Sequence, residues 1–310
     1  MARRRAVQPN GGEAPWRIAQ DSTVKLSARA PVLHAVPGFF VQGEDQVGAP
    51  DPPHYAAHLG LLPKKTWTEI DEVIGDGKEK KLVIFLRHGE AQHNADKARV
   101  GDEEWTNHLQ FQADYTDAAL TSKGIQQAKD AGQMLKEEIE QRGLQLDLVV
   151  VSPLDRTLNT YEHAFADIPV DAPVISLEIA RETLGVCTCD RRLAMAPKRA
   201  AHPRVDFRLV KDEHDEWWTR DHRESDQEIE ARAAELMRYL LEERPERRIA
   251  VIEARAAELM RYLLEERPER RIAVVSHSGF IRASLRALGH RFYRPENGEF
   301  VPFPLKSMGF

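Results

Sequence analysis

The chain has few cysteines and no long apolar run. Its two cysteines, Cys187 and Cys189, lie too close together for a framework disulfide and are too few for a zinc site. We therefore expect ordinary reduced thiols, no bound metal and no cofactor. No stretch approaches the ~18 consecutive apolar residues that a transmembrane helix needs. These absences predict a cytoplasmic protein with no membrane partner.

An excess of positive charge is also missing. The formal net charge is −6, whereas proteins that grip the phosphate backbone of nucleic acids need a basic surface, so we expect no nucleic-acid partner. An anionic small molecule would have to be held by a local cluster of cations. The basic start, Met1–Arg5, lacks the apolar core of a secretory signal but leaves organellar targeting open. Nothing in the pattern specifies an oligomeric state.

The chain is long enough to bury a full core, with 310 residues and 42% hydrophobic content. Residues 1–30 mix both charges with little periodicity, which predicts a disordered N-terminal extension. Residues 31–310 are predicted to form the folded domain. Within it, the apolar segment Leu33–Gln42 is too hydrophobic for a free linker, and the turn-rich segment Gly43–Pro53 is expected to be a loop.

Beyond residue 80, apolar runs that predict buried strands alternate with stretches that predict helices. The expected strands are Leu82–Leu86, Leu146–Val151, Val174–Leu177 and Ile272–Ser276, and the expected helices are 122–141, Asp155–Ala166 and Phe280–Leu288. Thr121 is the expected N-cap of the first helix. This alternation predicts an α/β fold, a three-layer α/β/α sandwich with a mostly parallel central sheet.

Residues 229–251 recur without a single change as residues 252–274. Repeat architectures need about three or more units and normally diverge, so the two copies indicate a 23-residue tandem duplication, an assembly error or engineering. Each copy predicts one amphipathic helix, ended by a proline, and one short strand. Only the second copy runs directly into Val275–Gly279. We therefore expect the second copy to fill the sheet, the first strand to be displaced, and Leu236 or its counterpart Leu259 to be exposed.

Three expected strands end in residues suited to phosphate chemistry. Arg87-His88 follows the first strand, Arg156 lies in the opening turn of the helix after the second, and His277 follows the last. Ligand sites of open α/β sheets lie at these carboxyl ends. Arginine and helix N-termini bind phosphate oxygens, and histidine acts as a nucleophile or proton carrier. The sequence thus predicts a pocket for a dianionic phosphoryl group.

These motifs together resemble the histidine phosphatase (phosphoglycerate mutase-like) superfamily. The resemblance spans about residues 80–290, which is the expected core of the catalytic domain. It is carried by Arg87-His88-Gly89-Glu90 with Asn94, Leu120–Gly124 with Gln126-Gln127-Ala128, Ser152–Thr157 and Ser276–Phe280. Arg181–Gly185 and Cys189-Asp190-Arg191-Arg192 look like the fungal and plant phosphomutase-like branch. In that branch, a segment of the Pro-Gly-Phe-Phe-Val-Gln type makes residues 33–80 part of the fold.

The resemblance implies a role for each matching residue. His88 would be the nucleophile that becomes phosphohistidine. Arg87, Arg156 and His277 would bind the phosphoryl oxygens, with Asn94 assisting. Such a site works by positioning and charge stabilisation, so we expect metal-independent activity on a small phosphorylated substrate.

The general acid is implied to be Glu182, with Glu178 as a rival. The rival stays open because the spacing from Glu182 to Gly185 is one residue shorter than the family's usual spacing. A carboxyl near the phosphate can hold the raised pKa that proton donation requires. Trp217-Trp218 is expected to pack the neighbouring insertion, with a lid as the alternative.

Hydrolysis is the favoured reaction. Phosphoglycerate mutases carry a Glu-Arg-His-Tyr-Gly-type segment and a substrate-sequestering insertion that this chain lacks. The sequence therefore predicts a phosphomonoester hydrolase. The alternatives are mutase-type phosphoryl transfer and a catalytically silent protein that only binds a phosphorylated ligand.

Overall fold

The computed structural model describes residues 32–44, 54–76, 80–168, 171–241 and 269–308. The strands are β1 (Val32–Ala35), β2 (Lys80–Arg87), β3 (Leu148–Val151), β4 (Val174–Ser176), β5 (Arg271–Ser276) and β6 (Phe300–Met308). The α-helices are α1 (Trp67–Ile74), α2 (Gln92–Val100), α3 (Asp102–Asn107), α4 (Ser122–Arg142), α5 (Asp155–Ala164), α6 (Met195–Ala201), α7 (Asp226–Leu241) and α9 (Ser278–Ala287). Short 3₁₀ turns include η5 (Glu178–Ala180) and η6 (Thr188–Asp190). The predicted extension 1–30 lies outside the described residues.

The described strands form one six-stranded sheet in the order β1-β6-β2-β5-β3-β4. The pairs β2–β5, β5–β3 and β3–β4 are parallel, and β6 runs antiparallel to both of its neighbours. Strand β2 is central and buried along almost its whole length, which explains its continuous apolar sequence. The carboxyl ends of the parallel strands meet at one edge of the sheet.

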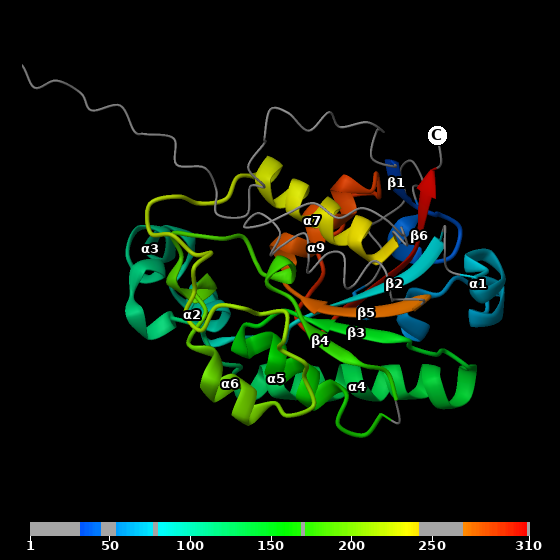
Figure 1. The fold of residues 1–310 in the computed structure, drawn as a ribbon, viewed down its shortest axis with the longest axis horizontal. Helices are drawn as coiled ribbons and strands as arrows, with labels where there is room; N and C mark the ends of the chain where they lie inside the picture. Colours follow the sequence, from blue (N-terminus) through cyan, green and yellow to red (C-terminus); the bar gives the residue numbers. More distant parts are fainter. Residues whose placement is uncertain (1–31, 45–53, 77–79, 169–170, 242–268, 309–310) are drawn as a thin grey trace, which may run out of the picture.

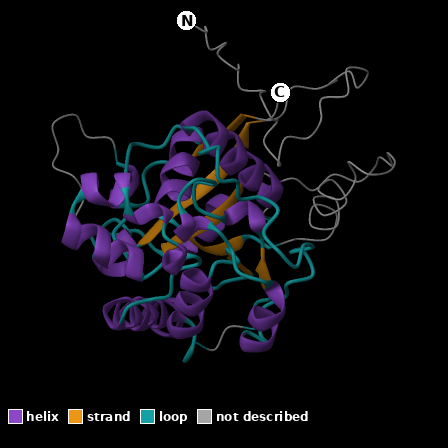
Figure 2. Cartoon of the chain, turned by 90° about the vertical axis from the view of Figure 1, so that its left-hand side faces the viewer, coloured by secondary structure: helices purple, strands orange, loops and turns teal. Residues whose placement is uncertain are grey.

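Helices cover both faces of the sheet (Figure 1; Figure 2, strands orange between purple helices). Successive side chains of β2 point to opposite faces of the sheet, as the two-residue period of a strand requires. Val83 and Phe85 pack in the cluster beneath α7 and α9, whereas Ile84 and Leu86 pack in the cluster that includes residues of α4 and α5. The predicted three-layer sandwich with a mostly parallel sheet is confirmed. No helix in the described part of the chain combines the length and apolar composition required to cross a membrane.

The elements predicted within the described residues from residue 80 onward form, with ends shifted by a few residues. Thr121 caps α4 as expected, since its side chain accepts from the Gly124 amide at 3.1 Å. Strand β6 was not predicted, and neither was β1. Strand β6 carries Pro302 and Pro304, which have no backbone N–H to donate to a neighbouring strand, so the local sequence does not predict a strand there. The two prolines are two residues apart, so their missing amides fall on one side of β6 and the other side stays intact.

The described residues before β2 belong to the folded unit. Strand β1 pairs with β6, and Phe40, Leu59 and Trp67 are buried in the cluster that includes residues of α4 and α5. This observation agrees with the branch resemblance, which makes residues 33–80 part of the fold.

The two copies of the duplicated segment contribute different elements. Strand β5 comes from the second copy, as predicted, but α7 comes from the first. Ile229, Ala233 and Leu236 of α7 are buried in the core, so the first copy is not simply displaced and Leu236 is not exposed. The first copy's strand and the second copy's helix, with Leu259, lie outside the described residues.

Candidate active site

Three segments that follow strand ends bring charged and imidazole side chains together. His88 follows β2, His277 follows β5, and Arg156 lies in the first turn of α5, after β3. The ring centroids of His88 and His277 are 5.0 Å apart. Arg156 Nε lies 3.2 Å from His277 Nδ1. All three side chains are buried, and they form the site at the edge that the strand-end argument predicts.

The hydrogen bonding of His88 fixes its tautomer. Its Nδ1 lies 2.7 Å from the Gly89 carbonyl oxygen. A carbonyl can only accept, so Nδ1 carries the proton and Nε2 keeps its lone pair. Burial, then the charges of Arg156 and Arg87, hold the pKa of His88 well below its usual range. His88 is therefore neutral near pH 7, which is the form that a nucleophile requires.

The loop that follows His88 is fitted tightly against the start of α4. A Cβ on Gly89 would lie 2.2 Å from the Gly124 carbonyl oxygen, so only glycine permits this approach. The Thr121 amide donates to the Glu90 carbonyl oxygen at 2.9 Å. The Leu120–Gly124 motif thus fixes the backbone on which His88 stands.

His277 is held in the opposite tautomer. The Arg156 guanidinium can only donate, so His277 Nδ1 accepts and Nε2 carries the proton. That proton is donated to Ser152 Oγ at 2.8 Å. The terminal nitrogens of Arg156 donate to the Cys189 carbonyl oxygen at 2.6 Å and to Asp190 Oδ1 at 3.0 Å. Protein contacts therefore fix both side chains before any ligand arrives.

Arg87 is buried with part of its donor capacity unused. Its Nη1 donates to the Pro295 carbonyl oxygen at 2.7 Å, whereas Nε has no acceptor among the described residues. No described carboxylate forms an ion pair with it. A buried guanidinium N–H without an acceptor costs free energy, and an anionic ligand would remove that cost.

A cavity of about 690 Å³ opens beside these residues. Its wall includes three of the six predicted site residues, Arg87, Asn94 and Glu182. His88, Arg156 and His277 are not in the wall and lie buried behind it. The cavity thus reaches the site from the side of α2 and of the first turns of α9.

The two candidate acids have different surroundings. Glu178 binds Arg181 at 2.9 Å and Arg192 at 2.7 Å in a buried ion network, and it is not in the cavity wall. Glu182 is in the wall, and its Oε2 accepts from the Gly279 amide at 3.1 Å. The geometry therefore favours Glu182 over Glu178 for contact with a ligand.

The surroundings of Glu182 favour the ionised form of its carboxyl group. Burial by itself would raise its pKa, but the amides of Thr183 and Gly279 and the charges of Arg156 and Arg223 outweigh burial and lower it. The site thus offers a carboxylate that can accept a proton once an anion enters.

The amide of Asn94 is engaged by protein groups rather than left open for a phosphoryl oxygen. Its Oδ1 accepts from the Ala91 amide at 3.0 Å, and its Nδ2 lies 3.0 Å from His93 Nε2. A phosphoryl oxygen that binds the Asn94 amide directly, as the resemblance implies, would therefore have to compete with these protein contacts.

Trp217 and Trp218 are not in the cavity wall. Trp218 Nε1 donates to the Cys187 carbonyl oxygen at 2.9 Å, and both tryptophan amides donate to Asp215. These contacts agree with the expected packing of the insertion and not with a lid.

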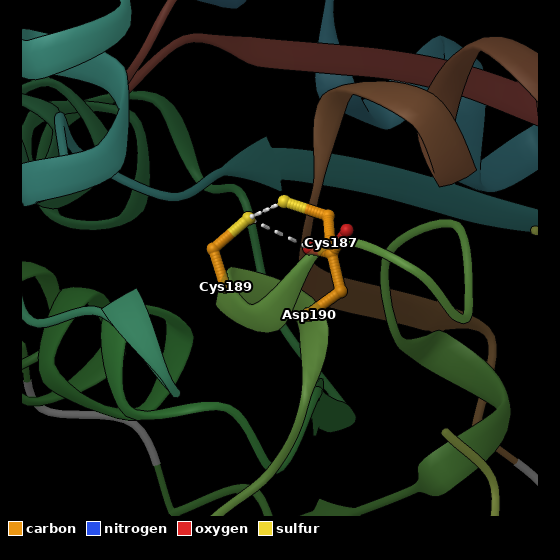
Figure 3. Close-up of side chains that lie close together, drawn as sticks. All are labelled: Cys187, Cys189 and Asp190. Atoms are coloured by element: carbon orange, nitrogen blue, oxygen red, sulfur yellow. Dashed lines mark hydrogen bonds between the residues drawn. The ribbon is translucent and has the colours of Figure 1, made fainter. Parts of the chain in front are cut away.

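Cys187 and Cys189 are free thiols whose sulfurs lie 2.7 Å apart, next to the Asp190 carboxylate (Figure 3). The ligand atoms of this trio lie within 4.8 Å of one another, close enough to share a metal ion. However, Asp190 already binds Arg156 and Arg223, so a metal ion would compete with both. The hydrogen bond that the Cys189 thiol shares with Cys187, followed by burial, raises the pKa of Cys189 well above its usual range, which also opposes metal ligation by its thiolate.

Asp190 and Arg223 were missed as site residues. Asp190 joins the two arginines, since Arg223 Nη1 donates to Asp190 Oδ2 at 2.7 Å, and both line the cavity. The Cys-Asp-Arg-Arg motif was a signal for Asp190. No local pattern marks Arg223.

Comparison with known proteins decides the family. The model of the histidine phosphatase superfamily, branch 1, matches residues 83–253. The chain belongs to this superfamily. Phosphomutase-like protein 3 of Candida albicans is 28% identical over 251 residues, which cover 79% of this chain and 71% of that protein. Phosphoglycerate mutase-like protein 1 of Arabidopsis thaliana is 28% identical over 260 residues, 74% of this chain and 80% of that protein.

Solved structures of histidine phosphatases are also similar to this chain. A mycobacterial glucosyl-3-phosphoglycerate phosphatase is 22% identical, covers 73% of this chain and 90% of its own, and has a TM-score of 0.40. The α-ribazole phosphatase of Shigella flexneri is 18% identical, covers 71% and 89%, and has a TM-score of 0.38. The family membership supports phosphoryl transfer on a phosphorylated metabolite as the class of reaction.

Proposed function

We propose that this protein hydrolyses a small phosphate monoester through a phosphohistidine on His88. One observation carries the proposal. His88 is buried and neutral, its Nε2 lone pair is available, and its neighbours Arg87 and Arg156 supply positive charge. A phosphoryl group placed there would meet a nucleophile and two cations at once, and charge stabilisation supplies most of the catalysis of phosphoryl transfer.

The first half-reaction transfers the phosphoryl group to the enzyme. His88 Nε2 attacks phosphorus, the ester P–O bond breaks, and the leaving oxygen takes a proton from the Glu182 carboxyl group. In the second half, water attacks phosphorus, Glu182 accepts its proton, the P–N bond breaks and orthophosphate leaves. Arg87 and Arg156 hold the phosphoryl oxygens, His277 Nε2 donates to them in place of Ser152 Oγ, and Asn94 assists through its contact with His93.

Glu182 must be protonated for the first step, although the protein groups around it lower the pKa of its carboxyl group. A phosphoryl dianion beside the carboxylate raises the carboxyl pKa through like-charge repulsion. Substrate binding would thus create the acid that the reaction needs, and Glu182 would return to the carboxylate once the product alcohol has taken its proton.

Hydrolysis is favoured over mutase chemistry because the chain lacks the Glu-Arg-His-Tyr-Gly-type segment and the sequestering insertion. The cavity is in the size range of small-molecule sites. Water entering it would be the phosphoryl acceptor, with no metal ion required.

Turnover of p-nitrophenyl phosphate tests the proposal. We expect the wild-type protein to release p-nitrophenol and orthophosphate and His88→Ala to be nearly inactive, with the exposed His108→Ala as the matched control. Phosphate binding without turnover would instead support the silent binder. Isomerisation of a phosphoglycerate at a higher rate than its hydrolysis would support the mutase.

A further inference from the structure

His93 lies in α2, lines the cavity and does not contact the ester in the mechanism above. Its side chain is 9% exposed, and its ring centroid lies 6.1 Å from that of His88. It also contacts Trp105, at 6.3 Å between ring centroids, and Trp105 packs edge-on against Tyr115 at 5.0 Å. The ring is therefore held by aromatic packing beside the proposed nucleophile.

The hydrogen bonds around Asn94 determine which nitrogen of His93 carries a proton. The Ala91 amide can only donate, so the atom that it contacts must be Asn94 Oδ1. The Asn94 atom facing His93 is then Nδ2, which donates to His93 Nε2 at 3.0 Å. Since Nε2 accepts, the single proton of neutral His93 is on Nδ1.

The resulting N–H donor has no partner in the part of the chain that the structure describes. His93 Nδ1 is buried and has no hydrogen-bond acceptor among the described residues. Burial lowers the pKa of His93 well below its usual range, and the charges of Arg156, Arg87 and Lys97 add to this. The ring is therefore neutral near pH 7. A buried donor without an acceptor costs about 1–3 kcal/mol, which a ligand oxygen would recover.

We propose that His93 is a further substrate-binding residue whose Nδ1–H donates to a phosphoryl oxygen of the ester at His88, an inference that rests on the proposed function. Arg87 Nε, in the wall of the same cavity, is also a buried donor without an acceptor. A phosphoryl group has several acceptor oxygens and satisfies both donors at once. Asn94 then serves as a positioning residue, because it fixes the His93 tautomer.

Two substitutions of His93 separate binding from packing. His93→Gln places its amide near the Nε2 position and removes the donor at Nδ1. His93→Asn places its amide near the Nδ1 position. Calorimetric titration with inorganic phosphate should show affinity about tenfold to a hundredfold weaker in His93→Gln, as the loss of a hydrogen bond to a charged group predicts. His93→Asn should keep most of the affinity, and the exposed control His108→Gln should match wild type.

Nitrogen NMR of the protein with ¹⁵N-labelled imidazoles measures the chemical shift of the His93 Nδ1–H group, which a purely structural role of His93 would leave unchanged when phosphate binds. Among the 12 histidines, the Nδ1–H signal that disappears in His93→Gln should shift when inorganic phosphate is added to wild type. Equal phosphate affinity in His93→Gln and wild type, equal losses in both His93 variants, or an unshifted signal would overturn the inference. Failure of the proposed function itself would look different, because wild type would then neither bind phosphate nor turn over p-nitrophenyl phosphate.

Discussion

Two buried arginines, Arg87 and Arg232, differ in how the protein satisfies them. Arg232 uses Nε and Nη2 on both oxygens of Glu224, at 2.8 and 2.7 Å, and its Nη1 donates to the carbonyl oxygens of Ile179 and Arg181. Arg87 has one carbonyl partner and an unpartnered Nε. A buried cation whose donors are all used holds the fold together. Arg87 lines the cavity with a donor unused and no ion pair to a described carboxylate, so it is prepared for an external anion.

The scaffold arginine also supports the site indirectly. Arg232 Nη2 donates to the Glu182 carbonyl oxygen at 3.0 Å, and Glu224 accepts from the Leu184 amide at 2.9 Å. The Arg232–Glu224 pair therefore holds the backbone segment that carries Glu182, while Arg87 faces the cavity. The comparison predicts that disrupting Arg87 lowers activity and disrupting the pair lowers stability.

Replacing Arg87 by alanine should give the largest effect on catalysis. An unpaired phosphoryl charge costs about 3–5 kcal/mol, so kcat/KM should fall by roughly 10²–10⁴, and Arg156→Ala should behave similarly. Lysine at position 87 should restore only part of the rate, because it lacks the planar fork. The free energy of unfolding of Arg87→Ala should decrease by at most about 1–3 kcal/mol, since the Pro295 carbonyl oxygen loses its donor but no described carboxylate loses an ion pair. A wild-type kcat/KM in Arg87→Ala would assign this residue to the scaffold.

Breaking the Arg232–Glu224 pair should lower stability instead. Glu224→Gln leaves the Arg232 charge buried and unpaired, so urea denaturation should show a loss of about 3–5 kcal/mol in the free energy of unfolding. We change Glu224 rather than Arg232 because Glu224 lies outside the duplicated segment. The second copy repeats the α7 sequence and carries Arg255 at the position that corresponds to Arg232. Below the unfolding transition, kcat should stay within a few-fold of wild type. A large loss of kcat at unchanged stability would contradict the division between site and scaffold.

Glutamine at the two candidate acids should sharpen the comparison further. Glu182→Gln should lower kcat on an alkyl phosphate by about a hundredfold, and less on p-nitrophenyl phosphate, whose leaving group needs no proton. Glu178→Gln should mainly reduce stability, because Arg181 and Arg192 would both lose the negatively charged partner that the Glu178 carboxylate provides. Glu178 would be the acid if Glu178→Gln, and not Glu182→Gln, lost more kcat on the alkyl phosphate than on p-nitrophenyl phosphate.

Removing one copy of the duplicated segment should have the smallest effect. Deleting residues 229–251 gives the same chain as deleting residues 242–264, because the copies are identical. The connection between α7 and β5 then shortens from 29 residues to six, while both elements keep their sequences. Closing a shorter connection costs less chain entropy, which should add about 1 kcal/mol to the free energy of unfolding and raise Tm by a few degrees. We expect the activity to be retained. Thermal unfolding of a less stable or inactive shortened protein would show that the extra copy is integral.

The sequence reveals the parts of this protein that depend on local pattern. Apolar runs and the residues behind them locate β2, β3 and β5 and hence His88, Arg156 and His277. Strand β6 escapes because its pairing with β2 and β1 outweighs the unfavourable local signal of Pro302 and Pro304.

Other features depend on contacts that no local pattern specifies. Which copy supplies α7 cannot be read from two identical segments. The Asn94 amide is engaged by Ala91 and His93, which are close in sequence, but the lack of a described acceptor for His93 Nδ1 depends on how the rest of the fold surrounds it. Arg223 reaches Asp190 across 33 residues of sequence.

The most direct test of the account is to trap the covalent intermediate. Rapid quench of the wild-type protein in alkaline detergent, after mixing with ³²P-labelled p-nitrophenyl phosphate, should be followed by digestion at alkaline pH. We expect an acid-labile, base-stable phosphohistidine in the peptide that contains His88, formed at least as fast as steady-state turnover, and none in His88→Ala. Active wild-type protein that yields no labelled peptide, or a His88→Ala protein that yields as much label as wild type, would contradict the account.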